Sequence, residues 1–258
     1  MTPAPPAPAQ PGTLYLVPAP LDFGAAPVPL RQVLPDATLE IAARLPCWIC
    51  ENAKTARAYL KRIDALHPLA RPLQQIELQE LPHAVHKKGD HGGQFDARPL
   101  LAPALQGRDI GLVSEAGLPA VADPGSSVVR AAHDLGLAVV PLAGAAAPLL
   151  ALAASGLNGQ NFAFVGYLPQ DGAQRARRLR ELEALARQSG QTQLCIETPY
   201  RNAALWDALL RTLQPDTRLA VVCGLTLPQA FVASRSVAQW RRGGAPPLDR
   251  PAVFAFGR

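Results

Sequence analysis

Short apolar runs that alternate with helix-length segments are the feature that most constrains the fold of this chain. The first part of the chain predicts strands at residues 13–17, 47–50, 75–81, 109–113 and 138–142, and helices at residues 53–66, 97–106, 126–135 and 145–154. Strands separated by helices of this length form βα units around a mainly parallel sheet. We therefore expect an N-terminal α/β domain over residues 13–157.

A glycine-rich break at residues 155–160 (SGLNGQ) separates this domain from a second one. Beyond it, strands are predicted at residues 162–165, 193–197, 218–223, 230–235 and 252–256, and helices at residues 174–187 and 202–213. Consecutive strands near the end of the chain indicate antiparallel pairing. We expect a C-terminal α/β domain over residues 158–258 with a mixed sheet.

The first twelve residues (MTPAPPAPAQPG) are rich in proline and have neither a basic start nor an apolar core. This composition predicts a disordered tail over residues 1–12 rather than a signal peptide. No stretch of about 18 apolar residues runs without interruption, so no transmembrane helix is predicted. We expect a cytoplasmic protein that makes no contact with a membrane.

Ligands of open parallel sheets bind beyond the carboxyl ends of the strands. In this chain the loops that follow strands lie at residues 18–24, 51–54, 114–125 and 143–147. The most distinctive is 114–125 (SEAGLPAVADPG), in which Gly117 allows close approach of the backbone to a ligand. Asp123 is placed either to cap the helix that follows or to bind a ligand.

Five segments in this order resemble the ribosomal RNA small subunit methyltransferase I family. They are Ala19-Pro20 after the first strand, SEAGLPAVADPG at 114–125, PLAGAAA at 141–147, FVGYLP at 164–169 and ETPYR at 197–201. Members of that family typically show TPIGN, SDAGTPxISDPG, PLPGPSA, FxGFLP and ESPHR. The resemblance extends over about residues 13–226.

The resemblance implies a two-domain, tetrapyrrole-methylase-like fold that binds S-adenosylmethionine (SAM) in a cleft between the domains. It also implies methyl transfer to a ribose 2′-hydroxyl of small-subunit rRNA, although it does not single out a catalytic residue. The positions that it assigns to the cofactor are Pro20, Ser114, Glu115, Gly117, Leu118, Pro119, Ala122, Ala146, Ala147, Ile196, Glu197 and Leu225. The family's usual homodimer is expected here as well.

The sequence departs from the family pattern mainly in its loops. Asn52 stands where the family has aspartate, and Tyr200 replaces a histidine. The late RELTK motif becomes CGLTL, so that Cys223 and Leu227 replace basic residues. These changes leave three readings open: an rRNA methyltransferase, a methyltransferase acting on a small molecule, or a SAM- or RNA-binding protein without catalysis.

The net charge of +5, with 21 arginines and 4 lysines, suits an anionic partner such as RNA or the small ribosomal subunit, and equally suits a codon bias toward arginine. The residues that we expect to contact RNA are Lys54, Arg175, Arg177, Arg178, Arg180 and Arg201. The alternative for the arginines at 175–180 is a solvated helix face in which Glu181 and Glu183 pair locally.

Two further clusters contain residue types that can bind metals. Cys47 and Cys50 form a C-x-x-C, but they lie in an apolar run that predicts a buried strand, where residues three apart do not converge. His83, His86, Asp90 and His91 lie among glycines and lysines, which favours an exposed loop facing the methyl acceptor. No metal site is therefore predicted.

Overall fold

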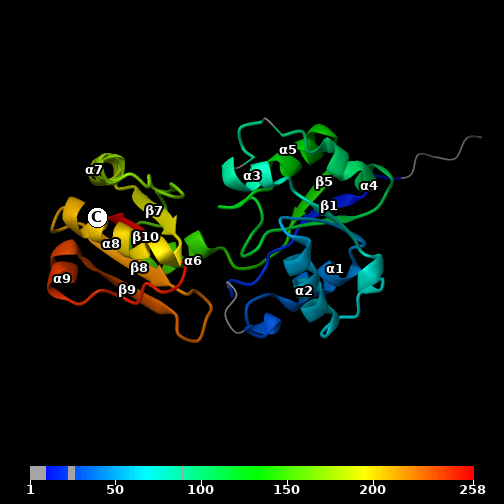
Figure 1. The fold of residues 1–258 in the computed structure, drawn as a ribbon, viewed down its shortest axis with the longest axis horizontal. Coiled ribbons are helices and arrows are strands. Elements are labelled where there is room, and N and C mark those ends of the chain that lie inside the picture. The colour runs from blue at the N-terminus through cyan, green and yellow to red at the C-terminus, as the bar shows by residue number, and fades with distance from the viewer. Residues whose placement is uncertain (1–9, 23–26, 89, 94) are drawn as a thin grey trace, which may run out of the picture. The chain divides into compact units, whose positions relative to one another are not determined.

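The computed structural model describes residues 10–22, 27–88, 90–93 and 95–258, without the side chains of residues 86–88. The chain divides into two compact units. Unit 1 comprises Met1–Pro20 and Pro27–Ala145, and unit 2 comprises Leu21–Ala26 and Ala146–Arg258 (Figure 1). Each unit contains one five-stranded sheet, so the predicted two-domain α/β fold is confirmed.

Unit 1 is built on a parallel sheet with the strand order β3-β2-β4-β1-β5. The strands are β1 (Thr13–Leu16), β2 (Cys47–Cys50), β3 (Glu77–Glu80), β4 (Ile110–Val113) and β5 (Ala138–Pro141). All four pairings are parallel, which places the carboxyl ends of the five strands at one edge. The predicted parallel sheet and its strands are confirmed.

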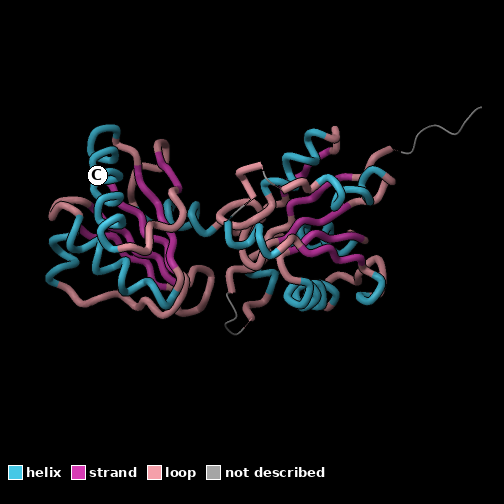
Figure 2. Tube along the Cα trace, turned by 45° about the horizontal axis from the view of Figure 1, so that its top comes forward, coloured by secondary structure: helices cyan, strands magenta, loops and turns pink. Residues whose placement is uncertain are grey.

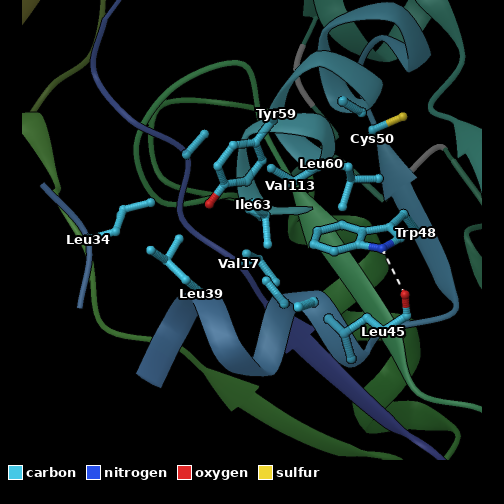
Figure 3. Close-up of a cluster of buried hydrophobic side chains, with 14 of the residues drawn as sticks. Val17, Leu34, Leu39, Leu45, Trp48, Cys50, Tyr59, Leu60, Ile63 and Val113 are labelled. Atoms are coloured by element: carbon cyan, nitrogen blue, oxygen red, sulfur yellow. Dashed lines mark hydrogen bonds between the residues drawn. The ribbon is translucent and has the colours of Figure 1, made fainter. Parts of the chain in front are cut away.

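Strand β2 shows why these residues form a central strand. All four of its residues are buried, and successive side chains enter opposite faces of the sheet. Trp48 and Cys50 belong to one apolar cluster, whereas Cys47 and Ile49 belong to the other. Figure 3 shows the first cluster, in which the indole nitrogen of Trp48 donates a hydrogen bond to the Leu45 carbonyl at 3.2 Å.

Helices cover both faces of this sheet (Figure 2). Helices α1 (Asp36–Arg44) and α2 (Ala53–Asp64) bury one side of each helix in the cluster around Trp48. The opposite cluster takes residues from the short helices η3 (Arg98–Leu101) and α4 (Ala102–Leu105) and from α5 (Ser126–Asp134). The turns η1 (Leu30–Gln32) and η2 (Leu73–Gln75) and the short helix α3 (His83–Lys88) complete the unit.

Unit 2 contains a mixed sheet with the order β6-β7-β10-β8-β9. Its strands are β6 (Phe162–Phe164), β7 (Thr192–Glu197), β8 (Arg218–Cys223), β9 (Phe231–Ser236) and β10 (Ala252–Gly257). Only the β6–β7 pair is parallel, and the other three pairs are antiparallel, as the sequence predicts. One face is covered by α7 (Gly172–Ser189), α8 (Pro199–Thr212) and α9 (Val237–Arg242), and the other by α6 (Ala147–Ser155).

Helix α6 differs from its expected place. Its place in the sequence predicts that it ends the first domain, but Ala151 and Leu152 pack against Leu194, Val222 and Val253 of the second sheet. The helix is almost entirely apolar, so it has no polar face to indicate which core it covers. It therefore belongs to unit 2.

Two other expectations need correction. Residues 83–93 were expected as an exposed loop, yet residues 83–88 form α3 and Asp90 is only 4% exposed. Of the tail predicted at residues 1–12, residues 1–9 lie outside the described part of the chain. Within the described part, Gly12 is buried and its N–H donates to the Ala104 carbonyl at 2.8 Å. No helix in the described ranges is long and apolar enough to span a membrane.

The packing of Gly111 against Trp48 gives a test of the core of unit 1. A Cβ atom on Gly111 would lie 2.6 Å from Cε3 of Trp48, whose side chain is fully buried. We expect Gly111→Ala to lower the free energy of unfolding by about 1–3 kcal/mol, because the indole cannot move without disturbing its neighbours. Denaturant unfolding measures this. Gly92→Ala is the matched control, since a Cβ there meets nothing within 4 Å, and equal stability of the two variants would contradict the packing.

Candidate functional site

The loops after β1 and β4 are joined by a pair of backbone hydrogen bonds. Ala19 N–H donates to the Gly117 carbonyl at 2.9 Å, and Gly117 N–H donates to the Ala19 carbonyl at 3.0 Å. This isolated bridge holds Pro20 in the same loop region as Leu118 and Pro119. Three positions predicted to bind the cofactor are thereby brought to one end of the sheet.

The loop after β5 packs against the same region. A Cβ atom on Gly144 would lie 2.3 Å from Cγ of Pro18, so only glycine permits this approach. The Thr38 hydroxyl of α1 donates to the Ala143 carbonyl at 2.8 Å, and the Tyr59 hydroxyl of α2 donates to the Pro18 carbonyl at 2.8 Å. Helices on one face of the sheet thus hold both loops in place.

The loop after β2 contacts Glu115 directly. The Glu115 N–H donates to Oε1 of Glu51 at 3.2 Å, and the Thr55 hydroxyl donates to Oε1 of Glu115 at 2.5 Å. The Asn52 side chain caps α2 by accepting from the backbone N–H of Lys54 at 2.9 Å. Asparagine caps helices as well as aspartate does, which gives the departure at position 52 a structural account.

Backbone strain is concentrated in two loops. Among the residues that the structure describes, the non-glycine residues with positive φ are Ala120 (63°), Ala122 (69°) and Thr226 (66°). The first two lie in the loop after β4, and the third follows Leu225 in the loop after β8. Left-handed backbone at a β-branched residue is rare, and such strain typically gathers at ligand sites.

Both strained loops also carry a buried hydroxyl without a hydrogen-bond partner in the described structure. These are Oγ of Ser114, a residue that is 6% exposed, and Oγ1 of Thr226. An unsatisfied buried hydroxyl costs about 1–3 kcal/mol, so its presence calls for a partner such as a ligand or a water molecule.

Asp90 fixes the far end of the loop after β4. One carboxylate oxygen accepts from the Gly125 N–H at 2.8 Å and from both the N–H and the hydroxyl of Ser127, and the other accepts from the Ser126 hydroxyl at 2.7 Å. Burial alone would raise the pKa of Asp90, but these hydrogen bonds outweigh it and lower the pKa. The cap of α5 therefore comes from Asp90 and not from Asp123. Asp90 is thus buried and hydrogen-bonded within the fold, and does not lie on an exposed loop as expected.

Asp123 lies in an acidic environment within the same loop. Burial, followed by the negative charges of Glu51 and Glu115, raises the pKa of Asp123 to about 7. A carboxyl group of this kind can take up or release a proton near neutral pH. The same negative charges suit a cationic ligand group such as a sulfonium or an ammonium.

The second group of predicted cofactor positions lies in unit 2. Ala147, Ile196 and Leu225 pack against one apolar cluster formed by α6 and the strands β7, β8 and β10. Ala146 is buried at the start of α6. The structure therefore brings these positions together within their own unit.

Glu197 has partners that the sequence did not indicate. Its Oε1 atom accepts from the Thr198 N–H at 2.8 Å and lies 2.8 Å from both Nε and a terminal nitrogen of Arg201. Glu197 is 5% exposed, so this pair is held in a protected setting. The carboxylate thereby positions Arg201, one of the predicted RNA-binding residues.

The arginines at the start of α7 differ in their surroundings. Arg177 and Arg178 both pair with Glu181, at 3.0 and 3.4 Å, as the local-pairing alternative expects. Glu183, the other residue of that alternative, is instead buried and accepts from the Gln214 N–H at 2.8 Å. Arg180 is exposed, and Arg175 donates to the Gln170 carbonyl at 3.4 Å while its Nε is buried without a partner in the described structure. Lys54 is exposed at the start of α2.

Two further residues that depart from the family pattern, Cys223 and Leu227, are buried in unit 2. Cys223 is 2% exposed and its thiol donates to the Arg250 carbonyl at 3.3 Å, while Leu227 is 5% exposed. Cys47 and Cys50 are also buried on opposite faces of the sheet, and burial followed by the charges of Glu80 and Glu115 raises the pKa of Cys50 to about 12. These cysteines pack as small apolar side chains and are poor nucleophiles.

Sequence reasoning missed several residues of these loops. Ala120 and Thr226 carry no signal in the sequence, because alanine and threonine rarely adopt positive φ. The capping role of Asp90 was missed because its segment was predicted to be a loop. The contact of Thr55 with Glu115 was missed because Thr55 lies within a predicted helix. Helix caps are predicted from Ser, Thr, Asp or Asn directly before a helix. A cap supplied by a residue 35 positions away, as Asp90 is here, cannot be predicted in this way.

The raised pKa of Asp123 predicts a specific pH dependence of stability. Between its usual value near 3.8 and about 7, the folded state keeps a proton that the unfolded state has released. The ionised group therefore destabilises the fold increasingly from about pH 4 to pH 7. We expect Asp123→Asn to gain stability over the parent across this window, by on the order of 1 kcal/mol after solvent screening.

Thermal unfolding at a series of pH values measures this difference. Glu115→Gln serves as the comparison, because removing the neighbouring charge lowers the pKa of Asp123 and moves the window to lower pH. A stability difference between Asp123→Asn and the parent that does not change with pH would contradict the raised pKa.

Residues 37–239 match the family model of tetrapyrrole (corrin/porphyrin) methylases. The chain is 34% identical to the ribosomal RNA small subunit methyltransferase I of Mesorhizobium japonicum over 86% of this chain and 66% of that protein. The corresponding Bacillus subtilis protein is 37% identical over 65% of this chain and 56% of its own length. The chain thus matches about two thirds or less of the length of these relatives.

Solved structures of the same fold agree with the family match. The uroporphyrin-III C-methyltransferase of Thermus thermophilus superposes with a TM-score of 0.50 at 20% identity, covering 95% of this chain and 94% of that one. The methyltransferase CobJ superposes with a TM-score of 0.55 at 18% identity, covering 96% and 94%. At these identities the structures show the fold alone. By its match to the family model, this chain belongs to the tetrapyrrole (corrin/porphyrin) methylases.

Proposed function

We propose that this protein is a SAM-dependent methyltransferase that acts on a ribose 2′-hydroxyl of small-subunit rRNA. The observation that carries the proposal is the placement of backbone strain. The left-handed alanines and threonine of the described structure lie in the loop after β4 and in the loop after β8. Both loops hold residues that the family resemblance assigns to the cofactor.

The residues of the loop after β4 suit SAM chemically. Ser114 offers a buried hydroxyl that lacks a partner in the described structure, and Gly117 allows the backbone to come close to a ligand. Glu115 provides negative charge for the ammonium and sulfonium of the cofactor. Ala147, Ile196 and Leu225 offer an apolar surface of the kind that adenine takes, and their part in binding stays a prediction.

When bound, SAM supplies a methyl group on a sulfonium, which is transferred by in-line displacement. The chain would contribute mainly by holding the donor and acceptor in line. A ribose hydroxyl that accepts the methyl group would have to give up its proton, so the site would need a group able to take it. Asp123, with a pKa of about 7, is the carboxyl group at this edge best suited to accept it.

An rRNA substrate is supported by the relatives and by the charge of the chain. The relatives from Mesorhizobium japonicum and Bacillus subtilis are both named for methyl transfer to small-subunit ribosomal RNA. The net charge is +5, and Arg180 and Lys54 are exposed cations. On the basis of the family resemblance, we also propose that the protein is cytoplasmic and forms a homodimer.

A small-molecule substrate is the second candidate. It is favoured by the pairing of Arg177 and Arg178 with Glu181, which offsets charge that would otherwise face a phosphate. The two candidates share the cofactor site, and they differ in whether the arginines of α7 affect substrate binding. A binding protein without catalysis would keep the same cofactor affinity and transfer no methyl group.

The cofactor site is tested by Gly117→Val. Gly117 has a φ of 74°, which a β-branched residue tolerates poorly, and its new side chain would occupy the loop. We expect SAM affinity, measured by calorimetry, to fall at least about tenfold, corresponding to about 1.4 kcal/mol. Gly136→Val is the matched control, since Gly136 has a φ of 68° but lies at the amino end of β5. Equal SAM affinity in both variants would refute the assignment.

The RNA hypothesis is tested by replacing Arg175, Arg177, Arg178 and Arg180 together by glutamine. If these residues contact phosphates, RNA affinity should fall and its dependence on salt should flatten, by up to about one logarithmic unit of slope for each lost contact. SAM affinity is expected to stay unchanged. Unaltered RNA affinity and salt slope would leave the start of α7 as a solvated surface and would favour the small-molecule candidate.

A further inference from the structure

Two exposed tyrosines flank one arginine at the carboxyl end of the parallel β6–β7 pair. The central carbon of the Arg201 guanidinium lies 5.7 Å from the centre of the Tyr167 ring and 5.4 Å from the centre of the Tyr200 ring. Tyr167 lies in the loop between β6 and α7, and Tyr200 lies in the first turn of α8. Residues 33 positions apart thus form one surface feature, which we call the tyrosine platform (Tyr167, Tyr200 and Arg201).

The platform is held from beneath by the sheet. Arg201 is tied to the buried Glu197 by two contacts of 2.8 Å, and the Ile196 N–H donates to the Gly166 carbonyl at 3.1 Å. The second bond fixes the residue before Tyr167 beside the end of β7. A buried carboxylate and a ladder hydrogen bond therefore limit how far the three side chains can move.

The two rings are nevertheless open to solvent. Tyr200 is 80% exposed and Tyr167 is 53% exposed, although each is a large aromatic side chain. Tyrosine at such exposure gains little from burial, so the fold itself does not require aromatic residues there. Tyr200 also stands where the resembling family has histidine, another flat ring.

We propose that the tyrosine platform is a stacking site for an unpaired nucleobase of single-stranded RNA. Aromatic rings and guanidinium planes are the groups on which splayed bases stack. Glu197 offsets the charge of Arg201, so the platform recognises a base face more than a phosphate. Phosphate contacts would come from α7, which begins five residues after Tyr167. The inference rests on the proposed RNA substrate.

The test compares Tyr200→Ala with Tyr200→Trp in the full chain. The probe is a short single-stranded oligoadenylate that carries one 2-aminopurine, whose fluorescence is quenched on stacking. We expect Tyr200→Ala to weaken binding between about 5-fold and 150-fold and to reduce quenching, and Tyr200→Trp to retain both. Because tyrosine is uncharged, the salt slope should stay that of the parent, unlike in the glutamine variant of α7.

The outcomes separate this inference from the proposed function. If the parent methylates small-subunit RNA and Tyr200→Ala binds the probe as tightly as the parent, base stacking on the platform is refuted and the proposed function stands. If the parent neither binds the probe nor methylates RNA, both fail. A change in sedimentation of Tyr200→Ala with unchanged probe affinity would identify the platform as a contact between copies and would overturn base stacking. Tyr167→Leu, which keeps apolar bulk without a ring, is expected to weaken binding as well.

Discussion

The pair of backbone hydrogen bonds between Ala19 and Gly117 is the constraint on which the candidate site of unit 1 depends. It ties together two loops that leave neighbouring strands in the same direction. Because parallel strands end at one edge, a short bridge is enough to turn separate loops into one surface. The close contact of Gly144 with Pro18 adds a third loop to it.

The same surface carries features that work against stability. Left-handed alanines, a hydroxyl without a partner in the described structure and a carboxyl beside two other carboxylates each raise the free energy of the folded state. The apolar clusters on both faces of the sheet hold these features in place. A protein selected only for stability would have little reason to retain them in one loop. Their coincidence supports a ligand as the missing partner.

The strands were the most predictable part of the fold. The run at Cys47–Cys50 is apolar throughout and sits between turn signals, so its strand follows from the sequence. Helix α1 was missed because Pro35, at its N-cap position, offers no side-chain cap and no glycine marks its end. Helix α6 was found but assigned to the other unit, since a helix without a polar face does not reveal its core.

The candidate site was predictable only in outline. Motif positions located the loops, because glycine and proline leave clear signals in sequence. The contacts within them depend on distant residues, such as Thr55 on Glu115 and Arg201 on Glu197. Capping the next helix was one of the two roles that the sequence offered for Asp123, but the carboxylate that fills it, Asp90, comes from another segment. Long-range partners of this kind follow from tertiary packing and leave no local pattern.

The cap that Asp90 supplies has a consequence for the stability of unit 1. The N-cap residue of α5 is Gly125, which has no side chain to accept hydrogen bonds from the amide groups of the first turn. Its start is completed only when a residue 35 positions earlier has reached it. Until that segment, which contains the whole of β4, has closed, the first turn lacks a cap that is typically worth about 0.5–2 kcal/mol. The stability of a helix that appears local in the sequence therefore depends in part on a contact between distant segments of the chain.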